Sequence, residues 1–231
     1  MSRGDVLLYG VLPYAAVAVF IVGIIWRYTN DQLGWTSRST QLLESRTLRW
    51  GSILFHVGAL LAIGGHLIGI LVPSSFTRSI GLSDGAYHVI ATVGGITAAL
   101  AVTAGLAILI YRRLRYPRVR RTTTRMDVLV FGLLAAAILT GFAATVWNAA
   151  DETLYRESVA PWFRNLLVLN PEPGLMSGVN WLLQVHVSVV WVLVAAWPFS
   201  RLVHAFSIPT RYLTRSPIVY RERARTPARS A

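Results

Sequence analysis

The stretch SILFHVGALLAIGGHLIGIL, residues 52–71, decides the fold of this chain. It contains no Asp, Glu, Lys or Arg, and its only ionisable side chains are His56 and His66. A helix needs about 20 apolar residues to cross the roughly 30 Å hydrocarbon core of a bilayer. The stretch is therefore predicted to be a transmembrane helix. Its two imidazoles are candidates for a functional site, because ionisable groups are costly at membrane depth.

The rest of the chain has the same character. Of 231 residues, 54% are hydrophobic and 14% are charged, which excludes an ordinary soluble domain. Runs of at least 21 residues without Asp, Glu, Lys or Arg cover 6–26, 50–77, 85–111, 128–150 and 173–200. We predict an all-α integral membrane protein, a five-transmembrane-helix bundle with spans at about 5–27, 49–74, 85–112, 126–149 and 177–205. Residues 1–207 would form the membrane domain, and 208–231 an Arg-rich tail.

The basic residues predict the orientation of the bundle. All 22 are Arg: four lie in 27–49, seven in 112–125 and seven from 201 onward, against four on the opposite side. The positive-inside rule makes the Arg-rich side cytoplasmic, so we expect the N-terminus outside, the C-terminus cytoplasmic and the first span retained. This topology accounts for the net charge of +12. Membrane lipid is therefore an expected partner, and nucleic acid is not.

Three further expectations concern the connections and the chemistry available to the chain. Thr123 or Thr124 suits the N-cap of the fourth span. The long connection 151–179 contains Trp162 and Phe163 and predicts a short interfacial helix. The absence of cysteine excludes disulfides, thiolate metal sites and iron–sulfur clusters ligated by this chain.

The histidines pair by depth in the predicted membrane. With about 1.5 Å of rise per residue, His56 lies about 9 Å, and His66 about 24 Å, from the cytoplasmic start of their helix. The fifth span runs the opposite way, with His186 in its outer half and His204 at its inner boundary, about 27 Å further along. His56 therefore matches His204, and His66 matches His186. Eighteen residues are five whole turns, so the two histidines of the fifth span should share one face.

Two pairs of facing imidazoles suit two six-coordinate haems, because a porphyrin supplies four equatorial nitrogens and the protein supplies the axial two. A zinc or copper site needs three or four ligands at one point, and the depths separate these ligands into twos. A cofactor-free proton-coupled transporter, or plain hydrogen bonding across the bundle, stays open as an alternative. Small residues near the ligands would leave room for a macrocycle or let helices pack closely: Gly58, Ala62, Gly64, Gly65 and Gly69.

Four segments carry a resemblance to a known family: LPYAAVAVFIVGIIWRY (12–28), LFHVGALLAIGGHLIGIL (54–71), PRVRRTTTRMD (117–127) and PFSRLVHAFSIPTRYLTR (198–215). The chain resembles the gamma subunit of respiratory nitrate reductase, a membrane-bound dihaem cytochrome b. The last segment is the most specific of the four, and all four occur in the family's order.

The resemblance implies a quinol-oxidising subunit of a bacterial cytoplasmic membrane. Two haem b groups would be bound by His66 and His186 on the outer side, and by His56 and His204 on the inner side. Electrons from menaquinol or ubiquinol would pass inward to an iron–sulfur beta subunit and a molybdenum-containing alpha subunit that reduces nitrate. A cytochrome b subunit of a related quinone-linked oxidoreductase is the alternative within redox chemistry.

The expected quinol site contains one departure from the family. Family members often carry a lysine near the start of the third span that is tied to quinol binding, and Ala86 stands there in this lysine-free chain. Tyr87 and His88, next in sequence, are candidates to hydrogen-bond a quinone oxygen, although His88 would also suit a plain place at the headgroup interface. We expect the quinol to approach the backbone at Gly65, His66 and Gly69.

Two arginines at the inner ends of the spans are candidates for the propionates of the inner haem. Arg112 ends the third span and Arg201 the fifth, and a guanidinium fork suits a carboxylate. The alternative is that both serve only as positive-inside anchors.

Overall fold

Helices make up all the regular structure of the part of the chain that the computed structural model describes, residues 2–31, 34–148 and 155–206. The first span contains α1 (Arg3–Val6), a π-helical turn (Leu7–Val11) and α2 (Leu12–Asn30). The other long helices are α3 (Arg46–Leu71), α5 (Asp84–Arg115), α7 (Arg125–Trp147) and α9 (Trp181–Ala196). The short ones are α4 (Ser74–Ser79), α6 (Pro117–Arg120) and α8 (Ala160–Leu167).

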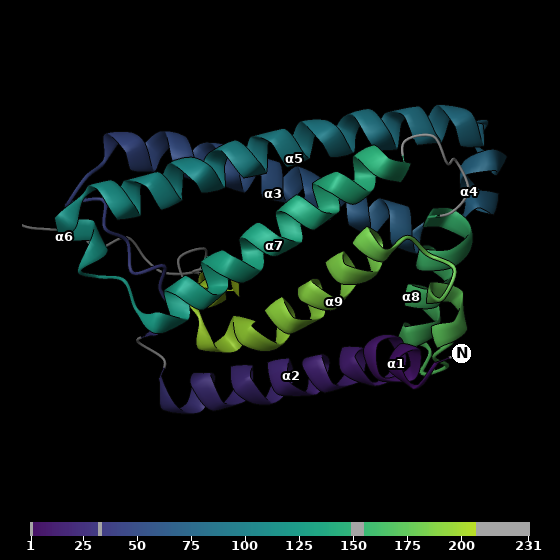
Figure 1. Cartoon of the computed structure of the whole chain (residues 1–231), viewed down its shortest axis with the longest axis horizontal. Helices are drawn as coiled ribbons and strands as arrows, with labels where there is room; N and C mark the ends of the chain where they lie inside the picture. The colour runs from purple at the N-terminus through teal and green to yellow at the C-terminus, as the bar shows by residue number, and fades with distance from the viewer. Residues whose placement is uncertain (1, 32–33, 149–154, 207–231) are drawn as a thin grey trace, which may run out of the picture.

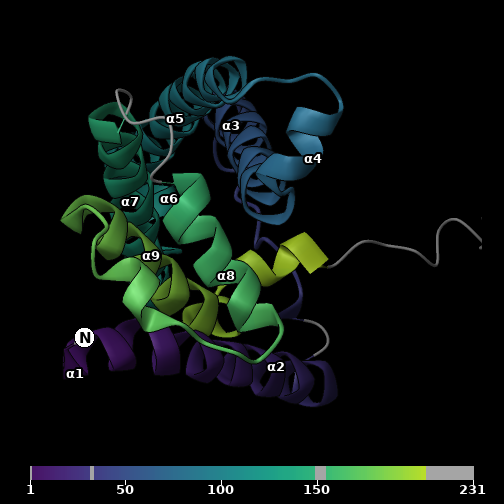
Figure 2. The same cartoon turned by 90° about the vertical axis from the view of Figure 1, so that its right-hand side faces the viewer.

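Five of these segments are long and apolar enough to cross a membrane, which confirms the predicted five-span bundle. Figure 1 shows them side by side along the long axis of the molecule, with α6 at one end and α4 and α8 at the other. We call these ends the Arg-rich end and the α8 end. Seen from the α8 end, α8 lies across the ends of the long helices (Figure 2). The tail 208–231 lies outside the described residues.

Packing follows a chain of neighbours from α3 to α2. The principal contacts join α3 to α5, α5 to α7, α7 to α9 and α9 to α2. Glycines bring α3 and α5 close together: a Cβ added at Gly58 would collide with the Val102 backbone, and one at Gly105 with the Phe55 backbone. Gly58 therefore serves helix packing, as small residues do in membrane bundles.

Side-chain caps fix where three of the long helices, α5, α7 and α9, begin. Thr124 accepts a hydrogen bond from the Asp127 N–H, and the Asp127 carboxylate accepts one from the Thr124 N–H, forming a capping box at α7. Ser83 caps α5 and Asn180 caps α9 in the simpler one-bond form. Of the two threonines predicted to cap the fourth span, Thr124 does so.

The fifth span differs from the single helix expected over 177–205. The α-helix ends at Ala196, because Pro198 has no N–H to donate to the preceding turn. A 3-10 turn (Trp197–Phe199) follows, Ser200 is extended with φ −114° and ψ −179°, and a second 3-10 segment covers Arg201–Phe206. The argument that His186 and His204 lie on one face of a continuous helix is therefore wrong.

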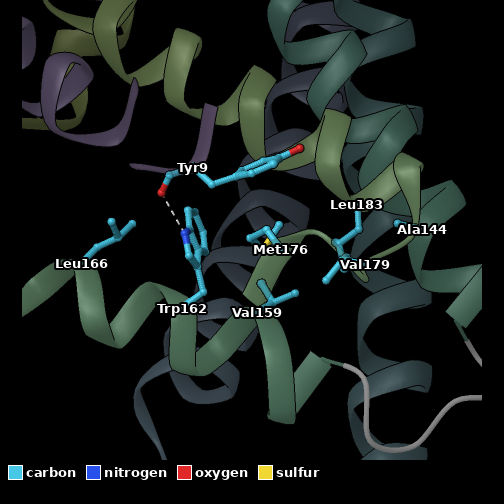
Figure 3. Packing of buried hydrophobic residues seen from close by; sticks show 8 residues of the cluster. All are labelled: Tyr9, Ala144, Val159, Trp162, Leu166, Met176, Val179 and Leu183. Carbon is cyan, nitrogen blue, oxygen red and sulfur yellow. Dashed lines mark hydrogen bonds between the residues drawn. The ribbon is translucent and has the colours of Figure 1, made fainter. Parts of the chain in front are cut away.

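At the α8 end, α8 packs against the bundle. Trp162 is 1% exposed and its Nε1 donates to the Tyr9 carbonyl at 2.9 Å. Met176 and Leu183 join the same buried cluster, which Figure 3 shows from close by. The short helix expected in 151–179 is present, and one of its faces is buried in protein. It thereby fixes the connection between α7 and α9.

Candidate functional site

Two imidazole pairs join α3 to the fifth span. The His66 and His186 rings have centroids 6.0 Å apart with planes inclined by 30°. The His56 and His204 rings have centroids 6.0 Å apart with planes inclined by 73°. The structure thus brings together the same partners that the depth argument paired. His204 comes from the second 3-10 segment, so the pairing does not need an unbroken fifth helix.

The same hydrogen bond orients all four rings. Each Nδ1 lies next to a backbone carbonyl: His56 on Ser52 at 2.7 Å, His66 on Ala62 at 2.6 Å, His186 on Ala137 at 2.9 Å and His204 on Arg201 at 2.6 Å. A carbonyl oxygen only accepts, so Nδ1 carries the proton and Nε2 carries the lone pair. This is the tautomer and second-shell arrangement found for metal-binding histidines.

The spacing within each pair suits one metal ion between two imidazoles. A metal–imidazole nitrogen bond is about 2 Å long, so two rings on opposite sides of one ion have centroids roughly 6 Å apart. Among the described residues, no three His, Cys, Asp or Glu side chains converge as a metal site. Each candidate site therefore offers two protein ligands, the number that a haem iron needs at its axial positions.

The helix arrangement and the glycines also suit a flat group between the imidazoles. In the described part of the chain, α3 and α9 are not among the principal packing pairs, although their histidines face each other. A Cβ added at Gly64 or Gly65, beside His66, would meet nothing within 4 Å. These two glycines do not serve packing within the chain, in contrast to Gly58.

Two of the expected quinol residues, Gly69 and Tyr87, meet at the α8 end. A Cβ at Gly69 would lie 3.1 Å from the Tyr87 hydroxyl oxygen and 3.1 Å from Tyr155 Cε1, so three elements converge where α3 reaches the α8 end. His88 follows Tyr87 on α5. Gly69 is buried, whereas Gly65, one turn earlier, is exposed. Gly69 lies four residues after Gly65 on α3 and is a direct neighbour of Tyr87 on α5.

Comparison with known proteins identifies the family of this chain. Residues 5–223 match the family described as nitrate reductase gamma subunit. The chain belongs to the nitrate reductase gamma subunit family. It is 44% identical to the nitrate reductase gamma chain of Bacillus subtilis over 219 residues, covering 94% of this chain and 98% of that protein.

Two further relatives match over nearly the same share of this chain. The identity to respiratory nitrate reductase 1 gamma chain of Escherichia coli is 30% over 217 residues, covering 93% of this chain and 96% of that protein. The nitrate reductase-like protein NarX of Mycobacterium tuberculosis is 46% identical over 220 residues, covering 94% of this chain and 34% of that protein. As a gamma subunit family member, the chain is a transmembrane oxidoreductase subunit of the nitrate reductase type.

Both propionate candidates, Arg112 and Arg201, donate hydrogen bonds to other side chains of the chain. Arg112 is 3% exposed and donates from Nε to Glu44 at 2.6 Å and from Nη1 to Thr40 at 2.8 Å. Arg201 donates to both oxygens of Asp127, at 2.5 and 2.7 Å. The propionate role of either arginine stays a prediction.

Glu44 joins the connection before α3 to the end of α5. Burial would raise its pKa, but hydrogen bonds from the Thr47 N–H, Arg112 and the Leu48 N–H outweigh burial and hold the pKa below its usual range. The carboxylate is therefore ionised at neutral pH beside a buried guanidinium.

Sequence reasoning missed two residues beside the expected quinol site, Tyr155 and Arg156. The Arg156 guanidinium lies 4.0 Å from the centre of the Tyr87 ring and bonds Thr77 at 2.9 Å and Asp84 at 3.3 Å. Burial raises the pKa of the Tyr155 hydroxyl, which keeps it protonated. The sequence signal is limited to the presence of Arg and Tyr in the connection that precedes the fifth span.

Proposed function

We propose that this chain is the quinol-oxidising, dihaem cytochrome b subunit of a respiratory nitrate reductase. The observation that carries the proposal is the repeated imidazole pair: 6.0 Å between centroids in both cases, with every Nδ1 on a backbone carbonyl. His66 and His186 would hold the outer haem b, and His56 and His204 the inner one. When bound, haem supplies one-electron redox chemistry at each pair.

The protein residues fix the geometry of that electron path. Ten residues along α3 separate His56 from His66, which is about 15 Å of helix rise. The backbone carbonyls hold all four rings in a single tautomer, so ligation requires no change of proton position. The result is a fixed row of two sites along the membrane normal.

Quinol would bind at the α8 end beside the outer pair. Gly65, Gly69 and His66 line the approach on α3, and Tyr87 and His88 supply polar groups from α5. The Tyr87 hydroxyl lies against Gly69, and Arg156 against the Tyr87 ring fixes the orientation of the ring. Oxidation of a quinol releases two protons and two electrons, and His88 or a bound water would take up the protons at this end.

The proposed orientation allows quinol oxidation to store energy across the membrane. We place the α8 end and the N-terminus outside and the Arg-rich end in the cytoplasm, because 18 of 22 Arg residues belong to the latter side. Protons are then released outside while electrons pass inward. Moving one charge across the membrane is worth about 2.3 kcal/mol per 100 mV.

The proposed partners lie on the cytoplasmic side of a bacterial inner membrane. An iron–sulfur beta subunit would accept electrons from the inner pair, and a molybdenum-containing alpha subunit would reduce nitrate to nitrite. The exposed apolar surfaces of the five long helices face lipid. The match to the gamma subunit family, the gamma-chain names of the relatives and the Arg-rich end support this assembly.

The variant His66→Ala tests the proposal. We expect loss of the outer b-type optical signal and of quinol-dependent nitrate reduction in the assembled complex. Nitrate reduction by an artificial donor that feeds the partner subunits should persist at the unmodified rate. Equal loss of both activities in an intact complex would contradict the proposed electron order.

A further inference from the structure

The inner imidazole pair is built differently from the outer one. His66, His56 and His186 lie on long α-helices, but His204 lies on the 3-10 segment Arg201–Phe206, beyond the break at Pro198 and Ser200. A 3-10 turn has poorer hydrogen-bond geometry than an α-helix and is used in short pieces. The orientation of His204 therefore depends on what holds this short segment in place.

Arg27 of α2 holds the break itself. Arg27 is 7% exposed, and its Nη1 donates to the Pro198 carbonyl at 2.8 Å and to the Ser200 carbonyl at 3.4 Å. Gly23, one turn earlier, lies so close that an added Cβ would be 2.7 Å from Pro198 Cβ. The start of the segment is thus fixed against α2 by a charged donor and by close packing.

Arg201 holds the segment from the other side. Its Nε and Nη2 bond both oxygens of Asp127, and Nη2 also donates to the Thr122 carbonyl at 2.8 Å. Asp127 is 6% exposed and belongs to the capping box that starts α7. A bidentate guanidinium–carboxylate pair is directional as well as strong, so it fixes where the Arg201 backbone lies.

The Arg201 carbonyl is the group that accepts from His204 Nδ1, at 2.6 Å. The chain of contacts therefore runs from the Asp127 carboxylate through Arg201 to the imidazole. The other three histidines take their carbonyls from the long helices α3 and α7, which need no such support.

We propose that Asp127, through its bidentate bond to Arg201, is a positioning residue for His204 and sets the geometry of the inner site. This inference rests on the proposed haem at the His56–His204 pair. It gives Arg201 a role in orienting the ligand through its backbone, and it makes Asp127, which is far from His204 in sequence, an indirect support of that ligand.

The test is Asp127→Asn in the assembled complex in its own membrane. This variant keeps the shape and an N-capping oxygen but loses the charged two-oxygen acceptor. A His56→Ala complex first identifies the inner haem signal. We expect the inner signal of Asp127→Asn to shift in redox titration and in the ferric electron paramagnetic resonance spectrum, with the outer signal unchanged. Quinol-to-nitrate turnover should fall about 10-fold, the lower range for second-shell changes.

Two matched variants separate positioning from capping and from general damage. Thr124→Ala removes the hydroxyl of the same capping box and should leave the inner signal unchanged, because the Asp127–Arg201 bond remains. Asp84→Asn removes a carboxylate that bonds Arg78 and Arg156 at the α8 end, and it should also spare the inner signal. Asp127→Glu, which keeps the charge, should restore most of the turnover.

Different results would overturn the positioning role of Asp127 and the proposed function. The positioning role is overturned if the inner haem signal of Asp127→Asn equals that of the unmodified complex. It is also overturned if Thr124→Ala changes the inner signal as much as Asp127→Asn does. Where Asp127→Asn fails to accumulate, Arg201→Lys replaces it, and an unchanged inner signal there overturns the role equally. Absence of any b-type signal in the unmodified complex would instead remove the proposed function.

Discussion

His66 and His186 lie 6.0 Å apart between ring centroids, although 120 residues separate them and their helices α3 and α9 are not principal packing partners among the described residues. The planes of the His66 and His186 rings are inclined by 30°, against 73° for His56 and His204. The two sites therefore have the same distance between ring centroids and differ in the angle between the ring planes.

We expect Gly65 to be needed for binding of the haem and not for the stability of the haem-free chain. In Gly65→Ala the new methyl meets no atom of the chain within 4 Å, and Ala favours a helix over Gly by up to about 1 kcal/mol. We expect unchanged or raised thermal stability of the haem-free chain, together with a weakened or shifted outer b-type signal. Gly132→Ala on α7, equally open in the chain, is the control. An unaffected outer signal in Gly65→Ala would place the macrocycle elsewhere.

Tyr87 should contribute through its hydroxyl. In Tyr87→Phe the ring that Arg156 contacts remains, and only the oxygen beside Gly69 is lost. A net hydrogen bond is worth about 1 kcal/mol, so KM for quinol should rise roughly 5-fold. Steady-state quinol–nitrate kinetics measure this, and artificial-donor activity should not change. A KM equal to that of the unmodified complex would remove Tyr87 from the site.

His88 is the second polar candidate at the start of α5. In His88→Leu we expect quinol turnover to fall several-fold, because a group able to take up a proton is lost. Inhibitor binding at the quinol site should weaken in parallel. Unchanged turnover and unchanged inhibitor binding would restrict His88 to a place at the headgroup interface.

The Glu44–Arg112 pair should stabilise the chain in a pH-dependent way. Both side chains are largely buried, and breaking a buried pair costs about 3 kcal/mol, so Glu44→Gln should lower the free energy of unfolding by that amount at pH 7. The pKa of Glu44 is lowered in the folded chain, so its contribution is full above the ordinary value of 4.5 and is lost as the pH falls through the folded pKa.

Thermal unfolding of the detergent-solubilised chain between pH 7 and pH 3 checks this. The difference between unmodified and Glu44→Gln chains should shrink as the solution is acidified. Glu172→Gln, at an exposed position, should match the unmodified chain at every pH. A difference that persists at the acid end would mean that the lost stability is not that of the ionised pair.

Much of the fold could be predicted from the sequence because membrane crossing depends on local apolarity. The charge-free runs gave five spans, and the helix rise alone paired the histidines, since depth is additive along a helix. Pro198 is a local sequence signal for the break that divides the fifth span, because proline cannot donate to the preceding turn.

The arginine partners could not be predicted in the same way. Glu44 and Arg112 are 68 residues apart, and Asp127 and Arg201 are 74 apart. Their meeting depends on how connections fold over the helix ends, which no local pattern encodes. For the same reason Tyr155 and Arg156 could not be placed beside Gly69 and Tyr87 from the sequence.

The orientation can be tested because the chain has no cysteine. Single variants Ser39→Cys, on the Arg-rich side, and Ser79→Cys, at the end of α4, place a thiol at exposed positions. In intact cells, or cells with a permeable outer membrane, an impermeant maleimide should label Ser79→Cys and not Ser39→Cys. The opposite labelling pattern would reverse the assigned direction of electron flow.

Haem content tests the central claim most directly. The reduced-minus-oxidised optical spectrum and the haem-to-protein ratio of the purified subunit should give two haem b per chain. One haem should remain when either His66 or His56 is replaced by Ala. A purified chain without b-type bands, or with two haems that survive both substitutions, would contradict the paired-imidazole account.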